Sequence, residues 1–344
     1  MIVVWWLVIA VAGAFAVATI LKLYWKGAGL YRIRRAGPRR LTAERHRLWR
    51  DPDRRGLVDL AGGPGGAEGR PQPPFTFLEE HDGGTQPCCS VRDARGRRWR
   101  VKWGHEVRCE TFAVRLAWAL GYYAEVTHLV ESGTIEDAAP LRRARDCVDE
   151  TGRFTDGRFE LDDPAVRKLF EEHSWAWNDN PFVGTRELDG LKITVMLLSN
   201  WDAKDRRDVA RGSNTAIFEE QVSKWRREAR YLVSDWGGSM GRWGGTVMTR
   251  GRWDVDGFEA QSADFVRGVS NGCVVFGYSG QRTADIAHGI TVEHARWFHR
   301  LADRIEEAAI VSGLLASGAT ADEAARFARA FRIRIDQLGL AARR

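Results

Sequence analysis

The sequence YLVSDWG, residues 231–237, is an apolar strand that delivers Asp235 into a glycine turn. Two other stretches carry polar residues of the same kind. One is LSNWDAKD at 198–205, followed by GSNT at 212–215. The other is RVKW at 100–103, a strand that ends near Lys102 and precedes a predicted helix. In chain order these stretches supply a lysine, an aspartate, an asparagine and an aspartate, and the helix adds a glutamate, Glu110.

This set of residue types is the one that phosphoryl transfer from ATP requires. A lysine on a strand neutralises the inner phosphates, and a carboxylate on a helix holds that lysine in place. A second carboxylate orients the acceptor hydroxyl and takes its proton. A third carboxylate and an amide oxygen hold the magnesium ions that bridge the phosphates. The pattern therefore favours transfer of the ATP γ-phosphate to a hydroxyl, with ATP and Mg²⁺ or Mn²⁺ as cofactors.

A family resemblance rests on these motifs. The chain resembles the atypical branch of the protein-kinase-like superfamily, which holds the HipA-type toxin kinases, the spore-coat CotH kinases and the phosphoinositide lipid kinases. The segment ETFAVRLA at 110–117, followed by Gly121, is similar to the HipA-type helix that pairs with the lysine. The chain also resembles a group of bacterial membrane-anchored proteins, of no known activity, with the phrases NWDxKD, GSNTAI and SDWGxSxG.

The resemblance implies a role for each motif residue. Lys102 would contact the phosphates, and Glu110 would pair with Lys102. Asp202 resembles the catalytic aspartate and Lys204 the lysine two places on. The two residues that resemble metal ligands are Asn214 and Asp235.

Two features depart from the kinase pattern. No GxGxxG precedes Lys102, so only Gly83 and Gly84 are left to contact the nucleotide. Asn214 follows Asp202 by twelve residues, where the kinase pattern has about five. Residues 206–211 would then form an inserted loop, and Asp208 within it could bind the metal instead. The missing glycine-rich loop favours an alternative, a pseudokinase or nucleotide-binding scaffold without catalysis.

The fold class expected is α+β, with an N-terminal transmembrane helix followed by a two-lobed kinase-like domain. The small lobe, 75–130, would be a small antiparallel sheet plus a helix. Its strands are predicted at 75–79, 88–92 and 97–103, and its helix at 106–120. The large lobe, 131–344, would be mostly helical, with helices predicted from Asp163-Pro164, at 190–199, at 292–316 and at 321–338, and a short strand at 231–234.

The N-terminal segment is predicted to be a membrane anchor. Residues 2–21 carry no charge and are long enough, as a helix, to cross a bilayer. Residues 22–55 carry twelve Lys or Arg against three Asp or Glu, a net charge of +9. By the positive-inside rule we expect an anchor at 1–26 in the inner membrane, single-pass, with the body in the cytoplasm.

Two connecting segments follow the anchor. Residues 27–60 are expected to be a basic juxtamembrane arm that contacts anionic lipid. Residues 61–74 contain nine Gly or Pro in fourteen and are expected to be a linker.

The chain outside residues 22–55 has a net charge of −3, which disfavours nucleic acid as a partner of the body. The phosphoryl acceptor, a protein, a lipid or a small molecule, is left open.

Other site types have weaker signals. Disorder throughout is excluded, because 44% of residues are hydrophobic. The adjacent Cys88 and Cys89 fit no common zinc spacing. Ser239 lies in GGSMG, residues 237–241, which matches GxSxG, but it is not expected to be the nucleophile of a hydrolase. The fifteen tryptophans, including WAW at 175–177, would form either a stacking platform for sugars or bases, as in a carbohydrate-binding module, or a packed core.

Overall fold

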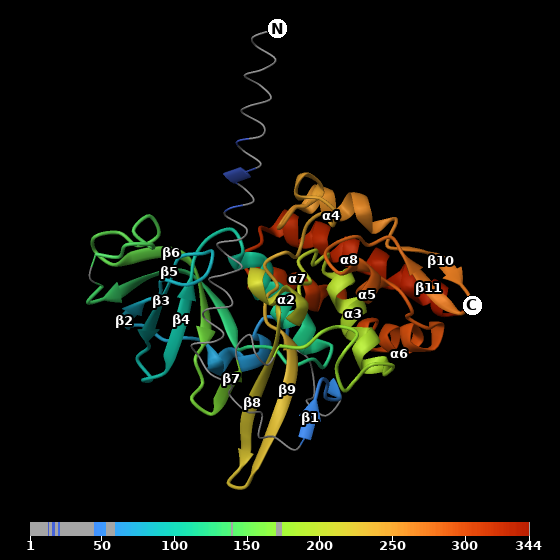
Figure 1. Cartoon of the computed structure of the whole chain (residues 1–344). Coiled ribbons are helices and arrows are strands. Elements are labelled where there is room, and N and C mark those ends of the chain that lie inside the picture. Colours follow the sequence, from blue (N-terminus) through green and yellow to red (C-terminus); the bar gives the residue numbers. More distant parts are fainter. Residues whose placement is uncertain are drawn as a thin grey trace.

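The computed structural model describes residues 13, 16, 17, 20, 45–52, 59–138, 140–169 and 174–343. Two regions lie side by side, a β-barrel with one helix against it and a larger, mainly helical region (Figure 1). Each region has its own apolar core. The candidate site residues are distributed over both regions.

Five strands form a closed barrel in the order β2-β3-β4-β6-β5. Their bounds are β2 Phe75–Glu80, β3 Cys88–Arg92, β4 Arg98–Lys102, β5 Thr127–Glu136 and β6 Arg153–Leu161. The β2–β5 pair is parallel and closes the barrel, and the other four pairs are antiparallel. Helix α2, Val107–Ala119, follows β4 and packs against β5 and β6.

The alternation of apolar and charged residues explains the β3–β4 hairpin. Val91, Trp99 and Val101 point into the barrel and are fully buried, whereas Arg92 and Arg100 lie on its outer face. The buried Asp93 fixes the turn, because it accepts bonds from the backbone N–H groups of residues 95 and 97. The hairpin therefore sets the position of Lys102 at the end of β4.

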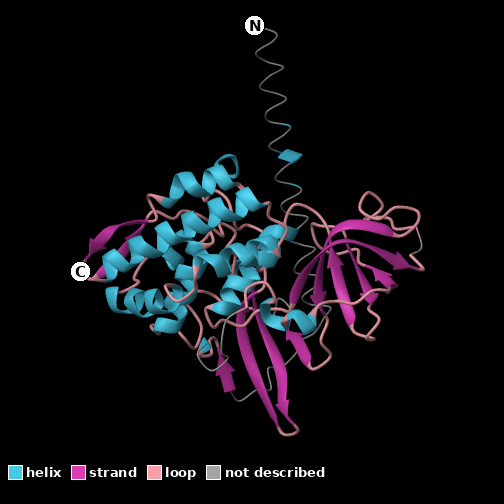
Figure 2. Cartoon of the chain, turned by 180° about the vertical axis from the view of Figure 1, so that it is seen from behind, coloured by secondary structure: helices cyan, strands magenta, loops and turns pink. Residues whose placement is uncertain are grey.

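The helical region contains six helices and two sheets among the described residues (Figure 2). The helices are α3 Arg186–Leu197, α4 Val255–Ser262, α5 Thr283–Ala287, α6 Val292–Ala302, α7 Glu307–Leu315 and α8 Ala321–Ala342. A four-stranded sheet has the order β1-β9-β8-β7, formed by β1 Arg45–Arg47, β7 Val166–Leu169, β8 Thr215–Ser223 and β9 Arg226–Val233. A separate hairpin pairs β10 Val266–Ser270 with β11 Cys273–Phe276.

Helix α8 supports the end of α3 through a buried arginine. Arg334 is fully buried and donates to the backbone oxygen of Leu197 and to the hydroxyl of Ser199, each at 2.8 Å. Ser199 has a positive φ of 56°, which a residue with a side chain rarely adopts. The C-terminal helix thus holds the strained turn that leads into the segment around Asp202.

The small-lobe strands and helix occur within two residues of their predicted bounds, but the expected small antiparallel sheet is instead a closed barrel. The predicted boundary at residue 130 falls inside β5, and the barrel continues to Leu161. The helix predicted from Asp163-Pro164 was wrong: residues 166–169 form β7, because pairing with β8 outweighs the local signal of a proline at a helix start. The region expected to be mostly helical also contains the β1-β9-β8-β7 sheet.

The predicted membrane anchor is corrected. In the part of the chain that the structure describes, no helix is long and apolar enough to cross a membrane. The longest helix described there, α8, has 22 residues and carries charged side chains along its length. This finding contradicts the predicted transmembrane helix, the single-pass topology and the inner-membrane location with a cytoplasmic body. The predicted span at 2–21 lies outside the described residues except at positions 13, 16, 17 and 20.

The two connecting segments also differ from expectation. The described end of the basic arm is folded into the body, since β1 pairs with β9 and Leu48 is buried; residues 27–44 and 53–58 lie outside the described residues. The expected linker at 61–74 contains two 3₁₀ turns, η2 Gly63–Gly65 and η3 Ala67–Gly69, of which η2 packs against α2. Glycine lets this segment approach the helix closely, because a Cβ at Gly63 would lie 3.1 Å from the Arg115 side chain.

Candidate functional site

The strand lysine and the helix carboxylate form a buried ion pair. Lys102 Nζ lies 3.0 Å from Glu110 Oε1 and 3.5 Å from Glu106 Oε2. Glu110 is 2% exposed, and its second oxygen lies 2.9 Å from Arg158 Nε on β6. Glu110 therefore joins α2 to two strands of the barrel.

Burial and charge act against each other in this cluster. Burial raises the pKa of Glu110 above its usual value, although the charges of Arg158 and Lys102 oppose that rise. Burial by itself would lower the pKa of Lys102, but the carboxylates of Glu110, Asp235 and Glu106 raise it above its usual value. Lys102 is thus held as a cation, and Asp235 is close enough to affect it from the other region of the molecule.

An asparagine connects the segment after α3 to the turn at Asp235. Asn200 is fully buried; its Nδ2 donates to the backbone oxygen of Asp235 at 3.2 Å. Its Oδ1 accepts from the backbone N–H of Asp202, also at 3.2 Å. One side chain therefore fixes both aspartates relative to each other.

Asp202 is held by two side chains. One carboxylate oxygen lies 3.2 Å from Lys204 Nζ, and the other accepts from Gln281 Nε2 at 2.6 Å. Burial, together with the nearby charge of Asp235, raises the pKa of Asp202 despite Lys204. A carboxylate whose pKa is raised accepts a proton more readily, which suits a general base.

Asn214 lies beside Asp202 in spite of the twelve-residue spacing. Its Nδ2 donates to the backbone oxygen of Asp202, and its own backbone N–H donates to the Lys204 oxygen at 3.2 Å. Its backbone oxygen accepts from Ser234 N at 2.9 Å, immediately before Asp235. The side-chain bond uses the amide nitrogen and leaves Oδ1 as the atom that can bind a cation.

The turn at Asp235 packs against the start of α2. Asp235 Oδ1 accepts from the backbone N–H of Gly237 at 2.9 Å. A Cβ at Gly237 would lie 2.8 Å from Glu106 Cδ, and Cys109 Sγ donates to the Gly237 oxygen at 3.5 Å. A side chain at position 237 would displace Glu106, so the glycine allows the turn to bring Asp235 close to the helix that carries Glu110.

The structure thus brings together six of the predicted site residues, and the other three lie outside this connected group. The six are Lys102, Glu110, Asp202, Lys204, Asn214 and Asp235. Asp208 lies in η5, Arg206–Arg211, where Arg211 and Arg282 bind its two oxygens, Arg282 Nη2 at 2.7 Å. Burial would raise the pKa of Asp208, but hydrogen bonds from these two arginines lower it below its usual value. With both oxygens engaged, Asp208 is a poorer metal ligand than Asn214.

The remaining two, Gly83 and Gly84, lie in the loop between β2 and β3. The loop is at the same end of the barrel as Lys102, since Cys88 pairs with Lys102 across β3 and β4. Arg143 donates to the backbone oxygens of both glycines at 2.9 Å. The loop is therefore held by an arginine of the barrel, and its glycines carry no side chain that would obstruct a ligand.

Three site residues escaped the sequence analysis: Arg158, Asn200 and Gln281. The alternation in residues 153–161 could have indicated the strand that carries Arg158, which is 6% exposed. Asn200 lies within the quoted motif, but nothing local shows that its amide reaches Asp235. Gln281 comes from a loop 79 residues after Asp202, and no sequence pattern marks it.

The alternative site types do not fit the described residues. Trp175 and Trp177 are core residues, 2% and 1% exposed, whose indole N–H groups donate to backbone oxygens. Ser239 is fully buried. Within the described ranges, no group of three or more His, Cys, Asp or Glu is placed to hold a metal ion by itself. The residues brought together here that could contact a cation are the carboxylate of Asp235 and the amide oxygen of Asn214.

Comparison with known proteins identifies no relative of this chain. No protein family matches the chain, and no curated protein or solved structure matches it either. Function must accordingly be argued from the geometry of the site.

Proposed function

We propose that this protein is a kinase-like phosphotransferase, which binds Mg-ATP and transfers the γ-phosphate to a hydroxyl. The observation that carries the proposal is the connected set Lys102, Asp202, Asn214 and Asp235, which four segments of the chain supply to one place. In phosphoryl transfer the protein takes little part in the covalent chemistry. Its residues position the phosphates and stabilise their charge.

Each residue has a role that its contacts support. Lys102, kept charged by Glu110, would bind the inner phosphate oxygens. Asp235 and the amide oxygen of Asn214 would hold Mg²⁺ or Mn²⁺, which supplies charge neutralisation at the phosphates when bound. Magnesium sites commonly use one or two carboxylates together with substrate phosphates, which agrees with the small number of protein ligands here.

Asp202 would orient the acceptor hydroxyl and take its proton. Its contacts with Lys204 and Gln281 fix the carboxylate in one position. Its raised pKa favours uptake of the proton. The acceptor itself is a hydroxyl on a protein, a lipid headgroup or a small molecule. The loop with Gly83 and Gly84 would cover the phosphates, with Arg143 holding its shape.

Replacing Asp235 with Asn is expected to abolish stabilisation by Mg-ATP. In the wild type, Mg-ATP at about a hundred times its Kd should add about 2.7 kcal/mol to the free energy of unfolding, because it binds only the folded state. The variant lacks the charge that holds the metal. The measurement is thermal unfolding of the full chain with ATP, with and without magnesium.

A matched control is Asp189→Asn. Asp189 is a buried aspartate that lies 3.2 Å from Lys192, as Asp202 lies 3.2 Å from Lys204, but it belongs to α3 outside the site. Its variant should keep the full Mg-ATP shift. Stabilisation without any turnover would favour the nucleotide-binding scaffold. The proposed function fails if the wild type shows no shift at millimolar Mg-ATP or Mn-ATP.

A further inference from the structure

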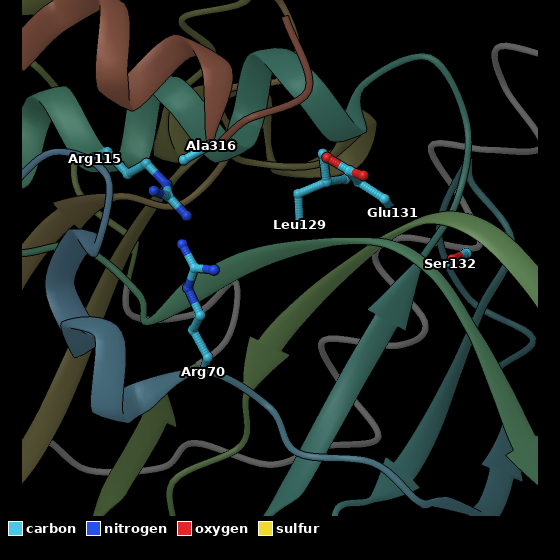
Figure 3. Close-up of a pocket in the computed structure, with 6 residues that line it drawn as sticks. All are labelled: Arg70, Arg115, Leu129, Glu131, Ser132 and Ala316. Carbon is cyan, nitrogen blue, oxygen red and sulfur yellow. The ribbon is translucent and has the colours of Figure 1, made fainter.

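A cavity of about 430 Å³ lies beside α2 (Figure 3). Its walls come from α2, β5, the end of η3 and the residue after α7. Its lining residues are Arg70, Arg115, Leu129, Glu131, Ser132 and Ala316. Glu110 and Arg115 are five positions apart on α2, about 140° around the helix, so they lie on different faces of that helix.

Arg115 is the buried member of the cavity. It is 1% exposed, and its Nη1 donates to the backbone oxygen of Leu60 at 2.9 Å and to that of Ala61. Its Nε has no hydrogen-bond partner among the described residues. Both acceptors are neutral carbonyls, so the guanidinium charge is not balanced by a direct ion pair in the described part of the chain. A buried charge in that state is costly unless a ligand pairs with it.

Arg70 faces Arg115 across the cavity. Figure 3 shows the two guanidinium groups pointing toward each other. Arg70 is exposed, and its side chain makes no ion pair with any described residue. Burial and the charge of Arg70 lower the pKa of Arg115 to about 10, with Asp59 opposing them. The neighbouring His128 is buried beside the same arginines, and burial together with their charge lowers its pKa to about 3.

We propose that this cavity binds the phosphate group of a small phosphorylated molecule, held between Arg70 and Arg115. Two guanidinium groups on opposite sides match the double charge and the several oxygens of a phosphate better than a single carboxylate. The cavity volume suits a small ligand. Glu131 at the rim repels the anion and limits its affinity. The site is separate from the proposed nucleotide site and does not depend on it.

The test is calorimetric titration of the full chain with inorganic phosphate, without magnesium and at constant ionic strength. Arg70→Ala should weaken binding about 10- to 100-fold, because it removes charge-assisted hydrogen bonds. Glu131→Gln should strengthen binding severalfold. Arg70 is the position of choice because its exposed side chain holds nothing else in place, whereas loss of Arg115 would also release the backbone at Leu60 and Ala61.

Two control variants locate the binding. Arg329→Ala and Arg300→Ala, which remove exposed arginines of α8 and α6, should both bind phosphate like the wild type. Equal binding by Arg70→Ala and wild type, or no binding at 10 mM phosphate (about ten times a typical weak Kd), overturns the proposal. If citrate binds as tightly as phosphate, the cavity takes carboxylates in general, and the assignment to phosphate is wrong.

Discussion

Replacing Asp202 with Asn is expected to lower the rate of ATP turnover about 100- to 10,000-fold while Mg-ATP binds as in the wild type. The amide keeps the shape of the side chain and can still contact Gln281, but it cannot take a proton from the acceptor hydroxyl. An interaction that is made only in the transition state affects kcat and leaves ground-state affinity unchanged. Asp202→Asn should therefore lose turnover and keep Mg-ATP binding, whereas Asp235→Asn should lose Mg-ATP binding.

The rate is measured as ADP release or autophosphorylation, and binding as the Mg-ATP thermal shift of the same preparation. Asp189→Asn serves again as the control, with wild-type values in both. If Asp202→Asn turns over ATP at the wild-type rate, Asp202 is not the base, and the assignment of its role is wrong.

Replacing Glu110 with Gln is expected to reduce the free energy of unfolding by about 3 kcal/mol. The variant leaves Lys102 and Arg158 without the buried carboxylate that lies within 3.0 Å of each. Both cations keep a second acidic partner, Glu106 and Glu160, which places the loss at the lower end of the range for a broken buried pair.

Urea unfolding of wild type, Glu110→Gln and Glu106→Gln measures this effect. Glu106 is the matched control, because it also contacts Lys102 but is 13% exposed at 3.5 Å. Its loss should cost about 1 kcal/mol or less for each of its two partly exposed ion pairs, with Lys102 and with Arg252. A Glu110→Gln variant as stable as Glu106→Gln would show that the buried pair does not hold α2 against the barrel.

The local parts of the site were predictable from the sequence. Lys102 ends a strand with clear alternation, and Asp235 follows an apolar strand and precedes a glycine turn. Glu110 lies one turn into a helix that ends just before Gly121. Each signal depends on neighbours within a few positions, so the pattern placed these residues on the correct elements. The start of the helix predicted at 321–338 was confirmed for the same reason, and a capping box between Thr320 and Glu323 fixes it.

The non-local parts were not predictable. Closure of the barrel depends on the pairing of β2 with β5, about sixty residues apart, which no local pattern encodes. The glycine-rich segment at 61–74 has the composition of a linker, yet contact with α2 orders it. The same holds for β7, where sheet pairing outweighed a local helix signal, and for Gln281, which reaches Asp202 only through the tertiary fold.

The most direct test of a shared nucleotide site is labelling with an ATP acyl-phosphate, which acylates lysines next to the bound phosphates. The chain has only seven lysines, and two of them, Lys102 and Lys204, lie in the site. Mass spectrometry should find the label on one or both, with protection by excess Mg-ATP and little label in Asp235→Asn. Lys192, which pairs with Asp189 at the same 3.2 Å as Lys204 with Asp202, is the internal control. Label confined to Lys192 or Lys224, or label at Lys102 that excess Mg-ATP does not prevent, would contradict a nucleotide site formed by Lys102, Asp202, Asn214 and Asp235.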